Sequence, residues 1–373
     1  MRESFLSILQ YVFSEEILKR VPPYSHIMAK RPKVFGHLLV EVIKAEGCVA
    51  CGSCVSVCSV EAISFIDGLP KLTGKCTACG ECYNACPRGE HDFGKLEAGA
   101  LGRNRSVDEA AHGILLGAYA VRTLQPEVKE HAQDGGAVTS ILLSCLDEGA
   151  SAIVAGLDKE KVWSPVPVLA RDNHIVIECA GTKYTSAPML LALKQAEKEG
   201  LKKLAFVSTP CQIHALRMRQ KNTTKTDSLA LGLFCMETFN YNELMAYLKE
   251  QGVDSAKVKK FEIKSGKFIA HREGEPPFEA KIRKLKELSR NCCRVCLDYT
   301  SELADLSIGN VGSPDGYSTV LVRTQKGEAS LRTAEERGLI EVKSLKDYQP
   351  GMSLVDRLSD MKKKENSGKL LNQ

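Results

Sequence analysis

Hydrophobic residues in the second half of the chain fall into two kinds of pattern. Short continuous apolar runs over residues 150–155, 203–207 and 229–234 are typical of buried strands. Segments with apolar residues at helical spacing predict helices over residues 136–148, 187–199, 210–220 and 242–251. This alternation predicts an α/β domain with some parallel strand pairing. Residues 257–282 alternate in short strand-like stretches, so we expect a mixed sheet with flanking helices rather than a purely parallel one.

The two ends of the chain differ from this domain. Residues 1–40 form a lead-in whose apolar residues follow helical spacing from about residue 3 to residue 20, ahead of Pro22. The apolar stripe consists of Phe5, Leu9, Val12, Phe13 and Ile17. We expect this amphipathic helix to pack on the chain's own large domain; the alternatives are docking to a partner subunit or second copy, and binding to a membrane surface. Residues 356–373 are polar and lysine-rich, and we expect a solvated tail there.

Composition narrows the class of protein. A chain of 373 residues is long enough for two or three domains, and its 43% hydrophobic and 26% charged residues are ordinary for a globular protein. A net charge of +5 is too small to indicate nucleic-acid binding, and the longest apolar run is too short for a transmembrane helix. The odd cysteine total, 15, and the lack of a secretory signal argue against a disulfide framework. We therefore expect a cytoplasmic protein, with peripheral attachment to a membrane complex left open, whose clustered cysteines bind metal.

Eight of the cysteines form two runs with identical spacing within residues 41–95. Each run reads Cys-x-x-Cys-x-x-Cys-x-x-x-Cys, and Pro87 follows the second run. This is the spacing of bacterial two-cluster ferredoxins, in which the fourth cysteine of each run ligates the other cluster. The expected ligands of the first [4Fe–4S] cluster are Cys48, Cys51, Cys54 and Cys86. The expected ligands of the second are Cys76, Cys79, Cys82 and Cys58.

A pair of zinc sites is the alternative for these runs, because Cys-x-x-Cys pairs also bind zinc. Zinc needs no third cysteine at this spacing, so the pattern favours iron–sulfur clusters. The sequence thus predicts a small α+β ferredoxin-like domain over residues 41–95. Such a domain moves single electrons and has no substrate chemistry of its own, so another part of the chain must supply or accept them.

Four of the remaining cysteines form a further candidate metal site. Cys211 and Cys235 each follow a predicted strand, at the sheet edge where α/β proteins place their sites. Cys293 and Cys296 form a Cys-x-x-Cys pair. Spacing alone leaves open whether these four hold a third [4Fe–4S] cluster or are unrelated buried or redox-active cysteines. Cys145 lies in an apolar helical pattern and is expected to be a small buried hydrophobe.

Two glycine-containing motifs are candidates for phosphate binding. Residues 134–139 (Asp-Gly-Gly-Ala-Val-Thr) open a predicted helix, whose free backbone N–H groups attract anions. The alternative is a simple turn in which Asp134 caps the helix. Residues 181–186 are either a cofactor loop or only a connector. Residues 257–290 carry eleven Lys or Arg against five Glu, which indicates either an anionic ligand or partner, or a solvated face.

These motifs, in this order along the chain, resemble those of a known family. They are Asp134-Gly-Gly-Ala-Val-Thr139, Gly181-Thr-Lys-Tyr184, Ser208-Thr-Pro-Cys-Gln212, Gly232-Leu-Phe-Cys235, Cys293-x-x-Cys296, Asp305-Leu-Ser-Ile-Gly309 and Gly312-Ser-Pro-Asp-Gly316. Over about residues 41–365 the chain resembles the beta subunits of coenzyme F420 hydrogenases and dehydrogenases, which include that of archaeal formate dehydrogenase. The ferredoxin-like unit in front makes it similar to the electron-input subunit of the dehydrogenase complex that oxidises reduced coenzyme F420.

The resemblance implies an α/β domain over residues 110–355 that binds FAD, coenzyme F420 and a third [4Fe–4S] cluster. By their place in the family motifs, the ligands of this cluster are Cys211, Cys235, Cys293 and Cys296, with Cys292 as a rival to Cys293. The resemblance also implies cofactor contacts at Gly135, Gly136, Thr139, Thr182, Lys183, Tyr184, Thr209, Pro210 and Gln212. Lys183 is the candidate catalytic residue, as an electrostatic aid to the flavin.

The implied activity is oxidation of reduced coenzyme F420, or reduction of F420, by hydride transfer via FAD. Electrons then pass singly through the clusters to a partner: a hydrogenase, a formate dehydrogenase, a heterodisulfide reductase or a membrane dehydrogenase complex. Two other functions stay open, namely a pigment-type reductase of another small molecule and a subunit that only relays electrons. We expect no nucleic-acid partner, because no aromatic stacking platform is visible, and association into a homo-oligomer is left open.

Overall fold

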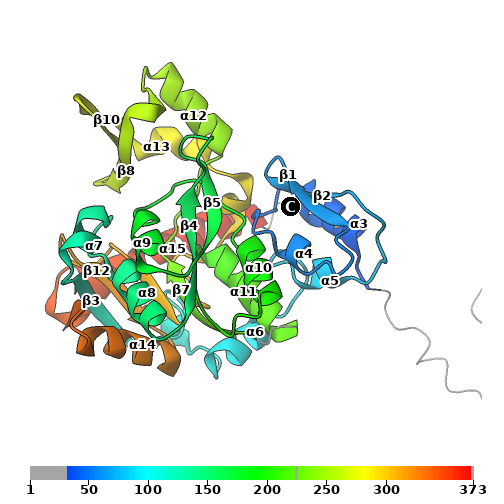
Figure 1. The fold of residues 1–373 in the computed structure, drawn as a ribbon, viewed down its shortest axis with the longest axis horizontal. Coiled ribbons are helices and arrows are strands. Elements are labelled where there is room, and N and C mark those ends of the chain that lie inside the picture. The colour runs from blue at the N-terminus through cyan, green and yellow to red at the C-terminus, as the bar shows by residue number, and fades with distance from the viewer. Residues whose placement is uncertain (1–31, 223–225, 371–373) are drawn as a thin grey trace, which may run out of the picture.

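The computed structural model describes residues 32–222 and 226–370 of the chain. The amphipathic helix expected between residues 3 and 20 lies outside these residues. Within them, a small cysteine-rich unit precedes a large α/β domain, and the two pack side by side (Figure 1).

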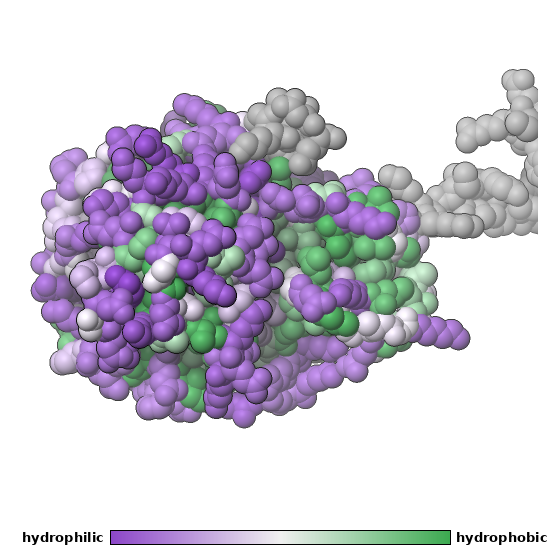
Figure 2. Space-filling view, turned by 90° about the horizontal axis from the view of Figure 1, so that it is seen from above, coloured by the Kyte–Doolittle hydropathy of each residue, from purple (hydrophilic) through white to green (hydrophobic). Residues whose placement is uncertain are grey.

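The small unit consists of short helical turns around a β-hairpin. Strands β1 (Ile63–Ile66) and β2 (Leu69–Leu72) pair antiparallel. The helical segments are α3 (Phe35–Leu38), the π-helical turn η2 (Leu39–Ile43), α4 (Ser53–Ser56) and α5 (Glu81–Asn84). Figure 2 shows apolar surface on this side of the molecule, and the exposed apolar side chains of the unit are Val40, Val60, Ile66, Leu69 and Leu72.

The large domain is built on one mixed sheet, which has eight strands within the described residues, in the order β13-β3-β12-β11-β7-β6-β4-β5. The strands are β3 (Gly117–Thr123), β4 (Ser151–Leu157), β5 (Pro165–Ala170), β6 (Lys203–Ser208), β7 (Asp227–Leu233), β11 (Leu306–Gly309), β12 (Ser318–Val322) and β13 (Ile340–Ser344). Strands β4, β6, β7 and β11 run parallel, and the outer strands are antiparallel to their neighbours. The predicted mixed α/β architecture is confirmed.

Helices cover both faces of this sheet because successive strand residues point in opposite directions. On β6, Ala205 and Val207 join the core on one face, and Leu204 and Phe206 join the core on the other. The helices on the first face are α7 (Pro126–His131), α8 (Ala137–Asp147), α9 (Asn173–Glu178) and α14 (Gln325–Glu336). Those on the second face are α6 (Phe93–Leu101), α10 (Leu190–Lys198) and α11 (Pro210–Asn222). The predicted strands and helices of this region are confirmed to within a few residues.

A smaller antiparallel sheet projects from the large domain between β7 and β11 (Figure 1). Its strands are β8 (Val258–Lys264), β9 (Lys267–Arg272) and β10 (Glu275–Lys281), and it packs on α12 (Tyr241–Glu250) and α13 (Ile282–Leu285). The short strands expected over residues 257–282 are therefore confirmed. Single 3-10 turns lie at η3 (Val107–Glu109), η4 (Ser255–Lys257), η5 (Lys286–Leu288), η6 (Asn291–Val295) and η7 (Leu345–Asp347).

The polar C-terminal segment is a packed helix, so the expectation of a solvated tail over residues 356–373 is wrong for the residues described. Helix α15 (Gly351–Leu370) buries the side chains of Ser359, Lys362 and Asn366. Each donates hydrogen bonds to backbone carbonyls of distant segments, which satisfies the buried polar groups. Neither α15 nor any other described helix is long and apolar enough to cross a membrane.

The fold predicts that Gly135 cannot carry a side chain. A Cβ atom at this position would lie 2.3 Å from the Ser318 backbone nitrogen and 2.5 Å from the Val121 carbonyl oxygen. Gly135→Ala should therefore lower the free energy of unfolding by about 2 kcal/mol or more, measured by urea denaturation. Gly99→Ala is the control, because that helical position has open space around it and should gain about 0.5–1 kcal/mol. Equal effects of the two substitutions would contradict this packing.

Candidate functional site

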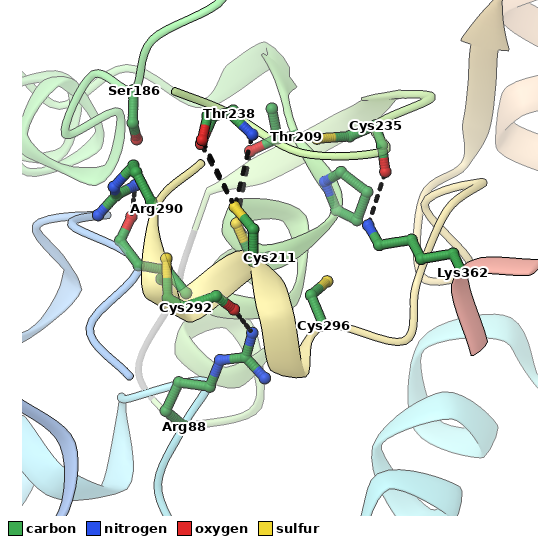
Figure 3. Close-up of a pocket in the computed structure, with 13 residues that line it drawn as sticks. Arg88, Ser186, Thr209, Cys211, Cys235, Thr238, Arg290, Cys292, Cys296 and Lys362 are labelled. Carbon is green, nitrogen blue, oxygen red and sulfur yellow. Dashed lines mark hydrogen bonds between the residues drawn. The ribbon is translucent and has the colours of Figure 1, made fainter. Parts of the chain in front are cut away.

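Cys211, Cys235, Cys293 and Cys296 meet at one cavity, which we call the cysteine cavity (Figure 3). Cys211 lies in the first turn of α11, directly after β6, and Cys235 follows β7. Because β6 and β7 are parallel neighbours, their carboxyl ends bring both thiols to one edge of the sheet. The full lining is Val49, Arg88, Ser186, Thr209, Pro210, Cys211, Cys235, Thr238, Arg290, Cys292, Cys293, Cys296 and Lys362.

The Cys-x-x-Cys pair reaches the cavity from η6 and the residue after it. Asn366 of α15 donates from Nδ2 to the carbonyl oxygens of Cys293 (3.0 Å) and Cys296 (2.7 Å). The backbone nitrogen of Thr238 lies 3.4 Å from the Cys293 sulfur and donates to it. This pair is therefore held by one segment that precedes it in the chain, the loop after β7, and by one that follows it, helix α15.

Three cationic side chains surround the cysteine cavity: Arg88, Arg290 and Lys362. Arg88 Nη2 donates to the Cys292 carbonyl (3.0 Å), and Lys362 Nζ donates to the Cys235 carbonyl (2.7 Å). Burial raises the pKa of the Cys211 thiol to about 11, and the charge of Arg88 opposes that rise. A water-poor cavity that disfavours free thiolates but supplies positive charge suits thiolates that are bound to metal.

Cys292 and Cys293 differ in their hydrogen bonds. The Cys292 thiol donates to the Cys293 sulfur, which lowers the pKa of Cys293 and raises that of Cys292. The same Cys293 sulfur accepts from the backbone of Thr238. The backbone N–H of Thr238 is therefore directed at the sulfur of Cys293, as suits a ligand thiolate at that position.

A second cavity lies in the small unit and is lined by the first ferredoxin-like set of cysteines: Cys48, Cys51, Cys54 and Cys86. The backbone turns sharply here, with positive φ angles of 54° at Ala50 and 80° at Gly52. The second run repeats these turns at Ala78 (56°) and Gly80 (87°). The repeated Cys-x-Ala-Cys-Gly sequence thus builds two equivalent loops, each leading into a one-turn helix.

The second set of cysteines lies at the surface of the small unit. Cys76 and Cys79 are exposed, Cys58 is half-buried and Cys82 is buried. Burial, followed by the charges of Cys79 and Cys76, raises the pKa of Cys82 to about 11. The Cys58 sulfur accepts from Ala62, whose carbonyl binds the loop that leads to Cys76. Among the residues that the structure describes, no group of three His, Cys, Asp or Glu side chains is arranged to hold a single metal ion.

The glycine motifs and the basic segment meet at a separate place, which we call the glycine-loop site. It is formed by residues 131–136, 181–184 and 310–316 together with β8. Thr182 N donates to Gln133 Oε1 (3.4 Å), Lys260 Nζ donates to Gln133 O (3.2 Å), and Lys264 Nζ pairs with Asp315 (3.1 Å). Strand β8 therefore brings two lysines of the basic segment to the N-terminus of α8.

The residues of the first glycine motif take defined positions at the start of α8. Gly136, with a φ of 72°, is the N-cap of α8, so the alternative that Asp134 caps this helix is wrong. Asp134 is instead hydrogen-bonded to Asn310, and burial raises the pKa of its carboxyl group. Gly135 is packed against β3 and β12, and Thr139 is buried in the first turns of α8.

The other predicted cofactor contacts are dispersed. Lys183 is half-buried, and its Nζ donates to the carbonyls of residues 179, 180 and 181. The Tyr184 hydroxyl accepts from Ile263 of β8 (3.0 Å). Gln212 is buried, and its amide binds the backbone of Ala187 and Met189. Thr209 and Pro210 line the cysteine cavity and lie apart from the glycine-loop site.

Several site residues carry no local sequence signal. Val49, Thr238, Arg290, Lys362 and Asn366 reach the cysteine cavity or its ligand segments only through the tertiary fold. Arg88 is the exception, because it directly follows the Cys-Pro that ends the second run. A basic residue directly beside a cluster motif is a local signal, present in the sequence, for a charge that offsets the thiolates.

Fold and site together define an α/β protein with a cysteine-lined cavity at the carboxyl edge of a mixed sheet. Comparison with known proteins places it among oxidoreductase subunits. Residues 118–194 match the N-terminal model, and residues 201–348 the C-terminal model, of the beta subunit of coenzyme F420 hydrogenase/dehydrogenase. The chain belongs to this family.

Individual relatives support the assignment. The chain is 37% identical to the coenzyme F420 hydrogenase subunit beta of Methanothermobacter thermautotrophicus, over 68% of this chain and 94% of that protein. It is 30% identical to a subunit of the F(420)H(2) dehydrogenase of Methanosarcina mazei, over 88% of this chain and 93% of that one. A chain of the F420-reducing [NiFe] hydrogenase complex of Methanosarcina barkeri superposes with a TM-score of 0.68 at 33% identity, covering 70% of this chain and 94% of that chain.

The half-buried ammonium group of Lys183 should make stability depend on pH. Burial lowers the pKa of Lys183 to about 8, below its value in an unfolded chain. Between about pH 8 and pH 10.5 the unfolded chain holds the extra proton, so the folded state gains about 1.4 kcal/mol per pH unit over this range. The difference in unfolding free energy between the wild type and Lys183→Met should therefore rise with pH in urea titrations. The exposed control Lys159→Met should follow the wild type, and a pH-independent difference for Lys183→Met would contradict the shift.

Proposed function

We propose that this protein oxidises reduced coenzyme F420, or reduces F420, with FAD as its flavin, and exchanges electrons with a partner oxidoreductase through three [4Fe–4S] clusters. Family membership supports the substrate, since relatives are named as subunits of coenzyme F420 hydrogenase and of F(420)H(2) dehydrogenase. The observation that carries the proposal is the convergence of Cys211, Cys235, Cys293 and Cys296 on one cavity beside the ferredoxin-like unit.

The donor sets suit the three clusters. Cys48, Cys51, Cys54 and Cys86 share one cavity, as one four-thiolate cluster requires. In the cysteine cavity, Cys211, Cys235, Cys293 and Cys296 supply four thiolates, and the surrounding cations offset their charge. For the remaining cluster we assign Cys58, Cys76, Cys79 and Cys82, on the evidence of spacing and of the closeness of the last three.

The glycine-loop site suits an anionic dinucleotide. The first turn of α8 presents free backbone N–H groups behind Gly136, and Lys260 and Lys264 add positive charge. Residues 181–186 lead from this site to the cysteine cavity, because Thr182 contacts Gln133 and Ser186 lines the cavity. We therefore assign FAD binding to Gly135, Gly136, Thr139, Thr182, Lys183 and Tyr184, with Thr209, Pro210 and Gln212 at the end facing the cavity.

When bound, FAD exchanges two electrons as a hydride and releases them singly, and each [4Fe–4S] cluster carries one electron at a time. The chain's own groups bind, orient and exclude water. Lys183, half-buried in the 181–184 loop, holds its ammonium group against the carbonyls of residues 179–181, and we assign it the role of offsetting negative charge on a bound flavin. Helix α15 contributes Lys362 to the lining of the cysteine cavity, and its Asn366 holds the carbonyls of Cys293 and Cys296.

The partner is a further oxidoreductase subunit. The solved chain of similar fold belongs to a hydrogenase complex. The chain is also 31% identical to the coenzyme F420-dependent sulfite reductase of Methanocaldococcus jannaschii over 87% of its own length but only 50% of that protein. In that relative the matching part is joined to additional chain. We propose that the present protein delivers electrons to a separate polypeptide in a comparable way.

The cluster assignment predicts about twelve irons per chain after anaerobic reconstitution. Cys211→Ser should lose about four of them and leave the ferredoxin-like pair intact, because it removes one ligand of a single cluster. Cys145→Ser is the matched control, since Cys145 is buried in the opposite core and should not affect iron content. Iron analysis giving about eight irons in the wild type would remove the cluster from the cysteine cavity.

The substrate assignment predicts that the flavin-replete protein oxidises reduced coenzyme F420 with a viologen dye as acceptor. Lys183→Met should lower kcat by about tenfold while leaving FAD bound, because it removes a charge that stabilises the reduced flavin. Absorbance of F420 measures the rate, and extraction identifies the flavin. Rapid oxidation of NADH, with no reaction of reduced F420, would overturn this function and favour a reductase of another small molecule.

A further inference from the structure

We propose that electrons enter the ferredoxin-like unit at the Cys48, Cys51, Cys54 and Cys86 set, which Arg290 and Arg88 position against the cysteine cavity, and that they leave from the second set. This order rests on the proposed function. Cys211, Cys235, Cys293 and Cys296 would hold one cluster and Cys48, Cys51, Cys54 and Cys86 its neighbour, and these would exchange one electron at a time with no bond formed or broken. The two electrons come from reduced coenzyme F420.

The two cavities share one lining residue. Val49, which directly follows Cys48, lines both the cysteine cavity and the cavity of the first cysteine set. The two candidate cluster sites therefore adjoin at this residue of the small unit. Such close spacing is what transfer of an electron between clusters requires.

Two arginines reach across the boundary between the two cavities, one from each side. Arg290, directly before η6, donates from Nη2 to the Cys48 carbonyl (3.0 Å) and from Nη1 to the Val49 carbonyl (3.2 Å). Arg88, in the small unit, donates from Nη2 to the Cys292 carbonyl (3.0 Å). Its Nε is buried and finds no acceptor among the described residues. Each ligand segment is thus held by a cation that comes from the other.

Further contacts fix the first cysteine set to the large domain. The Cys51 carbonyl accepts from Leu190 of α10 (3.0 Å), and Ser56 Oγ accepts from Arg219 of α11 (3.1 Å). Gly52 packs so closely on α10 that a Cβ would lie 2.9 Å from the Leu191 side chain. These contacts fix α4 and its loop at one distance from the cysteine cavity.

The second cysteine set is the more exposed of the two. Cys76 and Cys79 are exposed to solvent, whereas Cys51 and Cys54 are buried. An exposed ligand pair brings a cluster within reach of a partner's surface, and a buried pair does not. The structure therefore assigns entry to the first set and exit to the second.

The order can be tested without any substrate. In the reconstituted full chain reduced with dithionite, magnetic coupling to a neighbouring cluster splits the EPR signal of the cluster in the cysteine cavity. Cys79→Ser removes a surface ligand of the second set, and we expect the splitting to persist. Cys48→Ser removes the adjoining cluster, and we expect the splitting to be lost. Loss of the splitting in Cys79→Ser overturns the order, even if Cys48→Ser does not fold.

The positioning role of Arg290 is tested by rapid-freeze EPR after mixing with reduced coenzyme F420. Arg290→Gln should slow reduction of the ferredoxin-like unit by about tenfold or more relative to reduction of the cysteine-cavity cluster, measured in the same protein. Arg290→Lys should restore part of the loss, and the surface control Arg332→Gln should have no effect. Unchanged kinetics in an Arg290→Gln protein of full iron content overturn the role. If reduced F420 reduces no cluster in the wild type, the proposed function fails, and the dithionite experiment still decides the order.

Discussion

Charge compensation in the cysteine cavity is the constraint on which the rest of the structure depends. Five cysteine sulfurs share a space with little water, where unpaired thiolates are costly. The compensating cations come from three distant segments: Arg88 from the small unit, Arg290 from the η6 region and Lys362 from α15. The cavity is complete only when all three segments have docked. This requirement explains why the small unit, the large sheet and the C-terminal helix pack as one body.

Local pattern predicted the part of this site that parallel strands create. Cys211 and Cys235 follow β6 and β7, and the carboxyl ends of adjacent parallel strands must meet. The Cys293 and Cys296 pair could not be placed in this way. The chain leaves the sheet after β7, builds the β8–β10 sheet, and returns through η6. Only the tertiary fold brings that segment back to the strand ends, so the resemblance to a family was needed to join the four.

Composition misled where the fold supplies distant partners. Lys362 lies in a lysine-rich segment that favours a solvated tail. Its ammonium group is nevertheless buried, and it donates hydrogen bonds to the backbone carbonyls of residues 235 and 298. Gly135 has a second reason to be glycine that composition does not show, because close contact with β3 and β12 forbids a side chain there. The repeated turn at Ala50 and Gly52, by contrast, is encoded locally, and sequence spacing captures it. The sequence does not predict which cysteine set faces the large domain, because that depends on the tertiary contacts of Arg290.

The central claim is that the cysteine cavity holds an iron–sulfur cluster that links the flavin site to the ferredoxin-like unit. Anomalous diffraction at the iron absorption edge, from anaerobically grown crystals of the reconstituted full chain, tests it most directly. The account predicts three separate iron peaks, one of them enclosed by Cys211, Cys235, Cys293 and Cys296 and next to Val49. Iron confined to the small unit, with no anomalous peak among those four cysteines, would contradict it.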